Sequence, residues 1–381
     1  MQNAQLQIDS LSALTAERLA PLSALAPQLV LVFAASAYFR DSTFSNTLSQ
    51  HFPGAQIVGC SSAGEISSQG SYDDNALISA LHFDHPSFNV VSGNLTDMED
   101  SEAAGVRLGT QLLAACTTAP HTVLVFAPGT NINGSSLIAG LQSAMPQANI
   151  AGGLAGDGAN FVETYTLHQN NVDPKQIVVI GFSGEHIQAG FGSYGGWKPF
   201  GPVRKVTKAT HNVLFELDNE PALAVYKRYL GEHAAQLPAS GLLFPFSMLN
   251  ENREEVGLIR TILAVDEDAG SLTLAGDVFN EGFLQLMHAT TDSLVEGAAT
   301  AAEAANLAGN GQGFALLVSC IGRKLVMGGR TDEEVDAVSD VLGQQHTYAG
   351  FHSYGEISPG HQKIGCDLYN QTMTVTFLRE V

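Results

Sequence analysis

Two copies of one short motif carry the residues best suited to bind a small molecule. Residues 59–67 read GCSSAGEIS and residues 350–358 read GFHSYGEIS, and six of the nine positions are identical. Each copy contains a glutamate, Glu65 or Glu356, beside glycines that let a ligand approach the main chain closely. These carboxylates could bind an ammonium group or, as the alternative, accept main-chain N–H bonds in a duplicated turn.

A serine precedes each glutamate by three residues, and a third glycine-rich segment adds an aspartate. Ser62 and Ser353 are therefore predicted ligand-binding residues together with the two glutamates. Asp157, in GGLAGDG at 152–158, could line the same pocket or form an Asx turn. This segment lacks the Lys-Ser/Thr ending of a P-loop and the spacing of G-x-G-x-x-G, so it does not predict phosphate binding. Neither serine motif fits G-x-S-x-G, which argues against an esterase, and no enzymatic activity is expected.

Twelve histidines are available as haem or metal ligands, but none forms H-x-x-x-H or H-E-x-x-H, which argues against a zinc site on a helix. Haem needs a neutral imidazole at a pocket wall with its other nitrogen anchored. His352 is the first candidate for haem or metal ligation, because it lies inside the second motif next to Tyr354. His211, His346 and His361 follow. The alternative is a histidine whose nitrogens are satisfied by ordinary hydrogen bonds.

Two further side chains each allow a functional and a structural interpretation. Cys320, in the segment SCIGR, could be a thiolate ligand whose pKa is lowered by Arg323, or it could be a core residue. Trp197, in GGWKP, could stack on a planar ligand or anchor a packed loop.

A repeat of strand, helix and strand must position these residues. LVLVFA at 29–34 recurs as TVLVFA at 122–127, an offset of 93 residues, and a third copy reads FALLVS at 314–319. Such apolar, β-branched runs are typical of strands that are buried on both faces. The pattern predicts an α/β fold of two related halves, with mixed, mostly parallel sheets built from repeated strand–helix–strand units. We expect the domains to span residues 1–205 and 206–381.

Composition and charge narrow the class of protein further. The 381 residues include 38 acidic and 17 basic side chains, a formal net charge of −21. Such a surface repels phosphate backbones and anionic lipids, which argues against nucleic-acid and membrane partners. The four cysteines form no C-x-x-C pair, the N-terminal residues lack the basic and apolar regions of a secretory signal, and no run of about 18 apolar residues occurs. We therefore expect a cytoplasmic protein with reduced thiols.

Taken together, the motifs resemble those of the FIST family of bacterial sensory proteins over nearly the whole chain. The segments that carry the resemblance are GCSSAGEI at 59–66, GGLAGDG at 152–158, GGWKPFGPVRKVTKA at 195–209, NEPALAVYKRYLG at 219–231, SCIGRKLVMG at 319–328, GFHSYGEISP at 350–359 and NQTMTV at 370–375. The first three are similar to FIST N signatures, the fourth to the segment between the domains, and the last three to FIST C signatures.

The resemblance implies sensing of small ligands such as amino acids. A stand-alone subset of the family consists of haem proteins that bind nitric oxide and control a partner histidine kinase. The sequence resembles this subset in that we identify no kinase, cyclase or methyl-accepting segment in it. The leading expectation is therefore a cytoplasmic sensor that binds haem b and nitric oxide and regulates a histidine kinase, with His352, His211 and Tyr354 as cofactor-binding residues. The alternative is a haem-free sensor of an amino acid or other small polar metabolite, held between the two domains by Ser62, Glu65, Asp157, Ser353 and Glu356.

Overall fold

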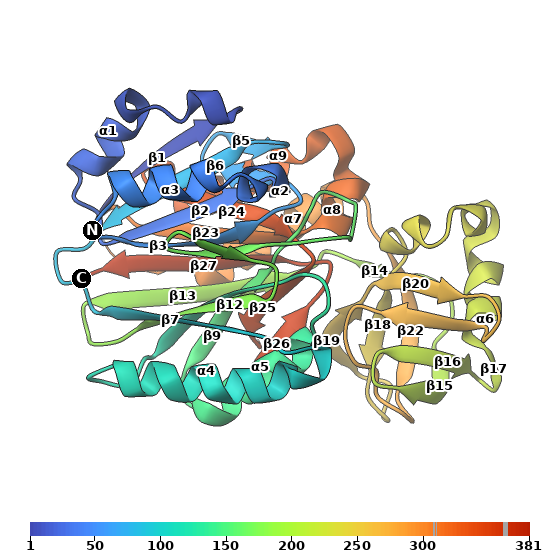
Figure 1. Ribbon diagram of the computed structural model, residues 1–381. Helices are drawn as coiled ribbons and strands as arrows, with labels where there is room; N and C mark the ends of the chain where they lie inside the picture. The colour runs from blue at the N-terminus through green and yellow to red at the C-terminus, as the bar shows by residue number, and fades with distance from the viewer. Residues whose placement is uncertain (308, 310, 361–364) are drawn as a thin grey trace.

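The computed structural model describes residues 1–307, 309, 311–360 and 365–381. The chain forms a core of three related α/β units and a separate β-rich region, which lies at the right of Figure 1. Each unit contributes a central parallel strand pair, antiparallel outer strands and covering helices. In the part of the chain that the structure describes, no helix is long and apolar enough to cross a membrane.

The first unit spans the N-terminal quarter of the chain. Its elements are β1 (Gln2–Ile8), α1 (Ala16–Ala24), β2 (Leu29–Ala34), α2 (Ser36–Arg40), α3 (Ser42–His51), β3 (Gln56–Ser61), β4 (Glu65–Ser67), β5 (Gly70–Tyr72) and β6 (Ala76–His82). The second unit repeats this order with β7 (Phe88–Asn94), α4 (Ser101–Ala115), β8 (Thr122–Ala127), α5 (Gly134–Ala144), β9 (Asn149–Leu154), β10 (Thr166–His168), β11 (Asn171–Asp173) and β12 (Gln176–Phe182).

The third unit is divided in the sequence, because the β-rich region is inserted after its first strand. It consists of β13 (Ile187–Tyr194), α7 (Thr291–Ala305), β23 (Phe314–Cys320), α8 (Ile321–Met327), α9 (Asp332–Leu342), β24 (Thr347–Ser353), β25 (Gly355–Pro359), β26 (Cys366–Tyr369) and β27 (Met373–Glu380). The expectation of two related halves is therefore corrected to three units around one core.

The units interlock because each one gives a hairpin to the sheet of another. The β4–β5 hairpin joins β24 in the third unit, the β10–β11 hairpin joins β3 in the first, and the β25–β26 hairpin joins β9 in the second. Among the named strands of the described residues, parallel pairing is confined to β2–β3, β8–β9 and β23–β24. The α/β class and the strand–helix–strand repeat are confirmed, but the expectation of mostly parallel sheets is wrong. The outer strands and the exchanged hairpins all enter antiparallel.

The three repeat strands lie at the centre of the molecule, as their apolar sequences predicted. Every residue of β2, β8 and β23 is buried. Gly59, Gly152 and Gly350 occupy equivalent positions on the neighbouring parallel strands. A Cβ there would lie 1.7–2.1 Å from a main-chain carbonyl oxygen of the central strand, so only glycine allows this close approach.

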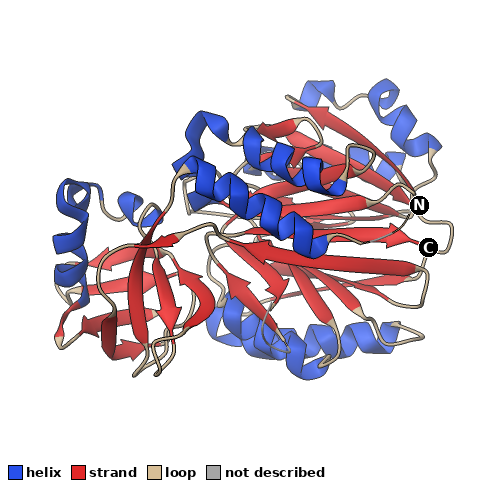
Figure 2. Cartoon of the chain, turned by 180° about the vertical axis from the view of Figure 1, so that it is seen from behind, coloured by secondary structure: helices blue, strands red, loops and turns tan. Residues whose placement is uncertain are grey.

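Alternate residues of the central strands face two different layers. Phe33 of β2 packs against Phe126 of β8 and Phe351 of β24, with ring centroids 5.5 and 4.9 Å apart, so the inner faces of the three sheets share one core. The outer faces are covered by α1 and α3, by α4 and α5, and by α7 and α9, respectively. Figure 2 shows these helices on the outside of the strands.

The inserted region, residues 198–288, forms its own nine-stranded sheet and hydrophobic core. Its elements are β14 (Lys198–Pro199), β15 (Arg204–Thr210), β16 (Val213–Leu217), β17 (Glu220–Pro221), α6 (Ala222–Leu230), β18 (Phe246–Leu249), β19 (Glu255–Arg260), β20 (Ile262–Asp266), β21 (Ser271–Leu274) and β22 (Phe283–His288). The predicted boundary between residues 1–205 and 206–381 falls at the start of β15, and this division stays a prediction.

Candidate functional site

The two GEIS motifs form equivalent turns, each between a central parallel strand and an exchanged hairpin. The turns contact each other directly: Ala63 N–H donates to the His352 carbonyl oxygen, and His352 N–H donates to that of Gly64, both at 2.8 Å. The structure therefore brings the predicted serine–glutamate pairs of both motifs to one place in the fold.

Within each turn the serine hydroxyl donates to the glutamate. Ser62 Oγ donates to Glu65 Oε1, and Ser353 Oγ donates to Glu356 Oε1 at 2.5 Å. The second oxygen of Glu65 accepts the Asn75 main-chain N–H at 3.1 Å. Both glutamates are buried, and burial raises the pKa of Glu65 to about 8 and that of Glu356 to about 7. These contacts fit the alternative in which the glutamates order the duplicated turn.

The surroundings of the two pairs differ. Glu356 Oε2 accepts two further hydrogen bonds from Thr372, at 3.1 Å from the main-chain nitrogen and 2.9 Å from the hydroxyl. Ser62 and Glu65 instead line a cavity of about 190 Å³, together with Asp157 of the second unit. The first copy of the motif is thus open to a small space, whereas the second is enclosed by protein.

Asp157 orders the loop that follows β9. Its carboxylate accepts main-chain N–H bonds from Phe161, Val162 and Glu163 at 2.8–2.9 Å, as well as the hydroxyl of Tyr354. The Tyr354 ring stacks on Phe161 with centroids 4.2 Å apart. Asp157 lines the cavity and also orders this loop, but its main-chain donors lie four to six residues on, so the contacts are not those of an Asx turn.

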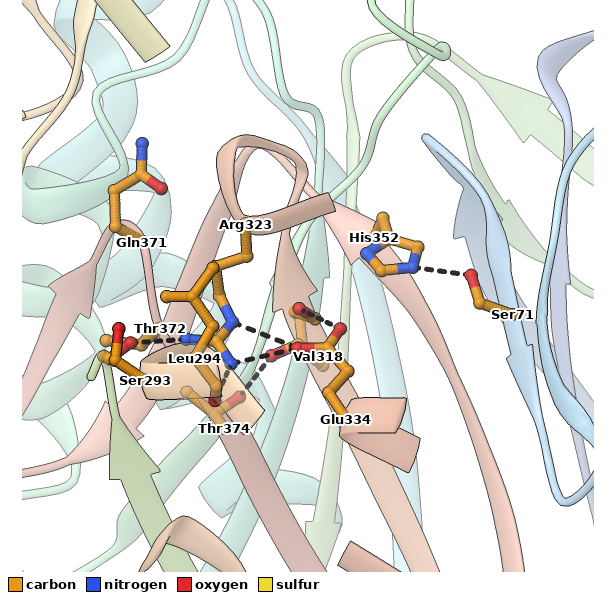
Figure 3. A network of polar contacts seen from close by, with 12 residues as sticks. Ser71, Ser293, Leu294, Val318, Arg323, Glu334, His352, Gln371, Thr372 and Thr374 are labelled. Atoms are coloured by element: carbon orange, nitrogen blue, oxygen red, sulfur yellow. Dashed lines mark hydrogen bonds and ion pairs between the residues drawn. The ribbon is translucent and has the colours of Figure 1, made fainter. Parts of the chain in front are cut away.

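The environment of His352 does not fit haem. The side chain is fully buried, its Nε2 lies 2.8 Å from Ser71 Oγ, and it lines neither the 190 Å³ cavity nor the larger one described below (Figure 3). Burial lowers the pKa of His352 well below its usual value, so the imidazole is neutral. The hydroxyl of Tyr354 donates a hydrogen bond to the carboxylate of Asp157. His352 and Tyr354 therefore serve the packing of the turn in this structure.

The other histidine candidates are scattered. His211 is exposed between β15 and β16 of the insert, and His346 Nδ1 accepts the Gly313 N–H at 2.9 Å. His361 lies outside the described residues. No group of three or more His, Cys, Asp or Glu residues within the described part could hold a metal ion.

Cys320 is a core residue. Burial raises the pKa of its thiol, which fits the core alternative and not the thiolate ligand, and the guanidinium of Arg323 bonds other groups. Arg323 is fully buried and pairs with Glu334 of α9, with Nη2 3.0 Å from Oε2 (Figure 3). It also donates to the carbonyl oxygens of Gly195 at 2.6 Å and Leu294 at 2.9 Å.

Gly195 and Trp197 line a second, larger cavity of about 890 Å³, here called the junction cavity. It lies where the insert meets the core. The core and the chain leading into the insert provide Ser193, Tyr194, Gly195, Gly196, Trp197, Thr300, Ala304, Gly360, Asp367, Tyr369 and Thr372; the insert provides Ser247, Asn250, Glu254, Glu255, Val256, Gly257, Ile259 and Met287. Trp197 is a packed anchor, since its Nε1 donates to the Gln371 carbonyl oxygen at 2.8 Å.

Sequence reasoning missed the rest of this cavity. Its lining comes from segments between Ser193 and Thr372 that share no motif. The one signal was Trp197 in a glycine-rich segment, which the sequence analysis treated as a loop anchor or stacking surface.

The fold and these cavities define a protein of three interlocked α/β units with a β-rich insert and a ligand-sized space between them. Family comparison agrees with the motifs: residues 28–220 match the FIST N domain and residues 222–359 match the FIST C domain. The chain belongs to the FIST family, whose domains are presumed to serve sensory signalling.

The curated relatives are distant. Proteins of Mycobacterium tuberculosis strains CDC 1551 and H37Rv, both described as uncharacterized, are 28% identical over 246 residues, covering 60% of this chain and 61% of theirs. An uncharacterized protein of Methanocaldococcus jannaschii is 25% identical over 212 residues, covering 53% of this chain and 40% of its own. The chain thus spans less than two thirds of the length of these relatives. The crystal structure of the cyanuric acid hydrolase from A. caulinodans aligns over 99% of this chain and 98% of its own, with a TM-score of 0.36 and 12% identity, a likeness too weak to bear on activity.

Proposed function

We propose that this protein is a non-catalytic, haem-free sensor that holds a small polar metabolite in the junction cavity. The observation that carries the proposal is the cavity itself. Its volume of about 890 Å³ lies in the usual range for small-molecule pockets, roughly 300–1,000 Å³. The core and the insert both line it, and a ligand that contacts both favours one arrangement of the two parts over others.

The structure offers a physical connection from this cavity to the third unit. Gly195 lines the cavity, and its carbonyl oxygen accepts a hydrogen bond from Arg323. Arg323 in turn pairs with Glu334 on α9, a helix that covers the outer face of the third sheet. A shift of the chain at Gly195 would therefore act on a buried ion pair and, through it, on a surface helix.

The haem-dependent mechanism is the less favoured proposal, because the surroundings of His352 do not fit the cofactor. A histidine kinase remains the expected recipient of the signal; this expectation rests on the family resemblance alone. The haemin arm of the experiment below tests the first of these points.

The test is a thermal-shift screen of the purified chain against amino acids, amines, sugars and organic acids, with haemin as a separate arm. We expect at least one metabolite to raise the Tm of the wild type, since a ligand at 100 times its Kd stabilises the folded state by about 2.7 kcal/mol. Ala304→Trp, which fills the cavity from an exposed position on α7, should abolish the shift. Glu303→Trp, exposed on the same helix and outside the lining, is the control.

Three results would overturn the proposal. The first is a ligand shift that persists undiminished in Ala304→Trp, and the second is the absence of a shift with any metabolite. The third is stoichiometric haemin uptake with a Soret band distinct from that of free haemin, which would restore the haem mechanism.

A further inference from the structure

The charges that line the junction cavity have one sign. Glu254, Glu255 and Asp367 contribute carboxylates, and no Lys, Arg or His belongs to the lining within the described residues. None of the three carboxylates lies within 4.0 Å of a cationic group in that part of the chain. Among the described residues, an amino-acid ligand would find a partner for its ammonium group here but no cation for its carboxylate.

Arg260 is a buried cation outside the described lining. It acts electrostatically on Asp367, but its hydrogen bonds go to main-chain oxygens of Asp277, Ile259 and Leu368 at 3.0–3.2 Å. Burial lowers the pKa of Arg260 to about 10, so it stays charged at neutral pH. Its contacts leave Asp367 without a direct charge partner in the described structure.

The hydroxyls of two buried side chains in the lining provide an independent observation. Tyr369 is 6% exposed and Ser247 is 5% exposed, and neither hydroxyl makes a hydrogen bond within the described residues. Both side chains are therefore buried almost completely, while their hydroxyls are free of protein partners at the wall of the cavity. A polar ligand in the cavity could bond them directly, since polar groups in folded proteins are nearly always satisfied by protein, water or ligand.

The acidic groups stand on opposite sides of the junction. Glu255 begins β19 and Glu254 precedes it, both in the insert, whereas Asp367 lies on β26 in the core. Trp197, held by its bond to Gln371, adds an aromatic surface to the lining. Cations are attracted to the face of an indole ring.

We propose that the ligand of the junction cavity is an aliphatic diamine: an organic dication with no carboxylate. One ammonium group binds Asp367 on the core, the other binds Glu254 and Glu255 on the insert, and the buried hydroxyls accept from these groups. The ligand thereby bridges the two parts of the molecule. This inference rests on the proposed sensor function and specifies its ligand class.

A matched series of six-carbon probes tests the charge requirement by calorimetry: hexane-1,6-diamine, 6-aminohexanoate, adipate and hexane-1,6-diol. We expect the diamine to bind at least about tenfold more tightly than 6-aminohexanoate, because a charge-assisted hydrogen bond contributes about that factor. Adipate and the diol should show no binding. Equal or tighter binding of any of these three, or no binding of the diamine, overturns the proposal.

Variants locate the site. Asp367→Asn and Glu255→Gln should each weaken diamine binding about tenfold. Asp268→Asn makes the same charge change outside the cavity lining and should leave the affinity unchanged. An equal loss in Asp268→Asn would reduce the effect to net charge and overturn the assigned site.

The outcomes separate this inference from the sensor function. If an anionic or neutral metabolite from the wider screen binds and Ala304→Trp abolishes its binding, the sensor function stands and the diamine class is wrong. If the diamine binds equally well to Ala304→Trp, the cavity is not its site and both proposals are wrong.

Discussion

The two copies of the Ser–Glu turn share a backbone and a hydrogen bond, but they differ in what surrounds them. Glu356 is enclosed and receives hydrogen bonds from Ser353 and from both the main chain and the side chain of Thr372. Glu65 receives bonds from Ser62 and Asn75 and lines a cavity of about 190 Å³. Motif identity therefore specified the turn but not its accessibility.

The second unit carries a different acidic residue at the corresponding point of the repeat. There the loop after β9 carries Asp157, which accepts three main-chain N–H bonds and the Tyr354 hydroxyl. In all three units an acidic side chain orders the chain after the central strand pair. The comparison teaches that the shared role is structural, and that a ligand role has to be argued from the surrounding space.

The largest effect should come from removing the enclosed glutamate. Glu356→Ala removes the acceptor of three hydrogen bonds, from a fully buried Ser353 hydroxyl and from two donors of Thr372, which also borders the junction cavity. We expect a loss of about 3 kcal/mol in the free energy of unfolding. Glu65→Ala should lose about 1 kcal/mol, because water in the adjacent cavity can bond the freed donors. Urea unfolding of both variants measures the difference; equal losses would show that the two turns are energetically alike.

The pH dependence should show the same pair of groups. Their folded-state pKa values, about 8 for Glu65 and about 7 for Glu356, exceed the ordinary value of 4.5. The folded protein therefore binds more protons than the unfolded chain between about pH 4.5 and 8, and stability falls as pH rises through this window. Urea unfolding at pH 5, 6, 7 and 8 should show this decline.

Glutamine variants assign the decline to each copy. Glu65→Gln should remove the part that extends to about pH 8, whereas Glu356→Gln should remove the part that ends near pH 7. Both variants stay neutral, as the protonated acids do. A wild-type decline that is unchanged in the two variants would show that other groups cause it.

The sequence predicted the repeated units well because their signals are local. The apolar runs at 29–34, 122–127 and 314–319 have no polar face, and burial on both sides follows directly. The nine-residue match between 59–67 and 350–358 likewise predicted two equivalent turns. Such patterns depend on neighbouring residues alone.

Pairing direction and the junction cavity depend on contacts between distant residues. An apolar run such as β8 does not reveal whether its neighbours are parallel, and the hairpins that cross between units have strands as short as Thr166–His168. Asp367 and Glu255 share the junction cavity although 112 positions separate them, and no periodicity connects them. His352 was chosen for its place in a motif, but its burial and its contact with Ser71 are tertiary facts.

The smallest effect should come from Tyr354→Phe, which tests whether this residue orders the turns or serves a cofactor. The hydroxyl donates to Asp157 and accepts main-chain N–H bonds from Asp157 and Phe161 at 3.2 and 3.1 Å. Phenylalanine keeps the ring stacked on Phe161, so the loss in unfolding free energy should be about 1 kcal/mol, the contribution of the hydroxyl bonds alone. Haemin titrations of the wild type and the variant should be identical. If the variant instead keeps full stability but differs in haemin absorbance, Tyr354 serves a cofactor rather than the contact between the third turn and the Asp157 loop.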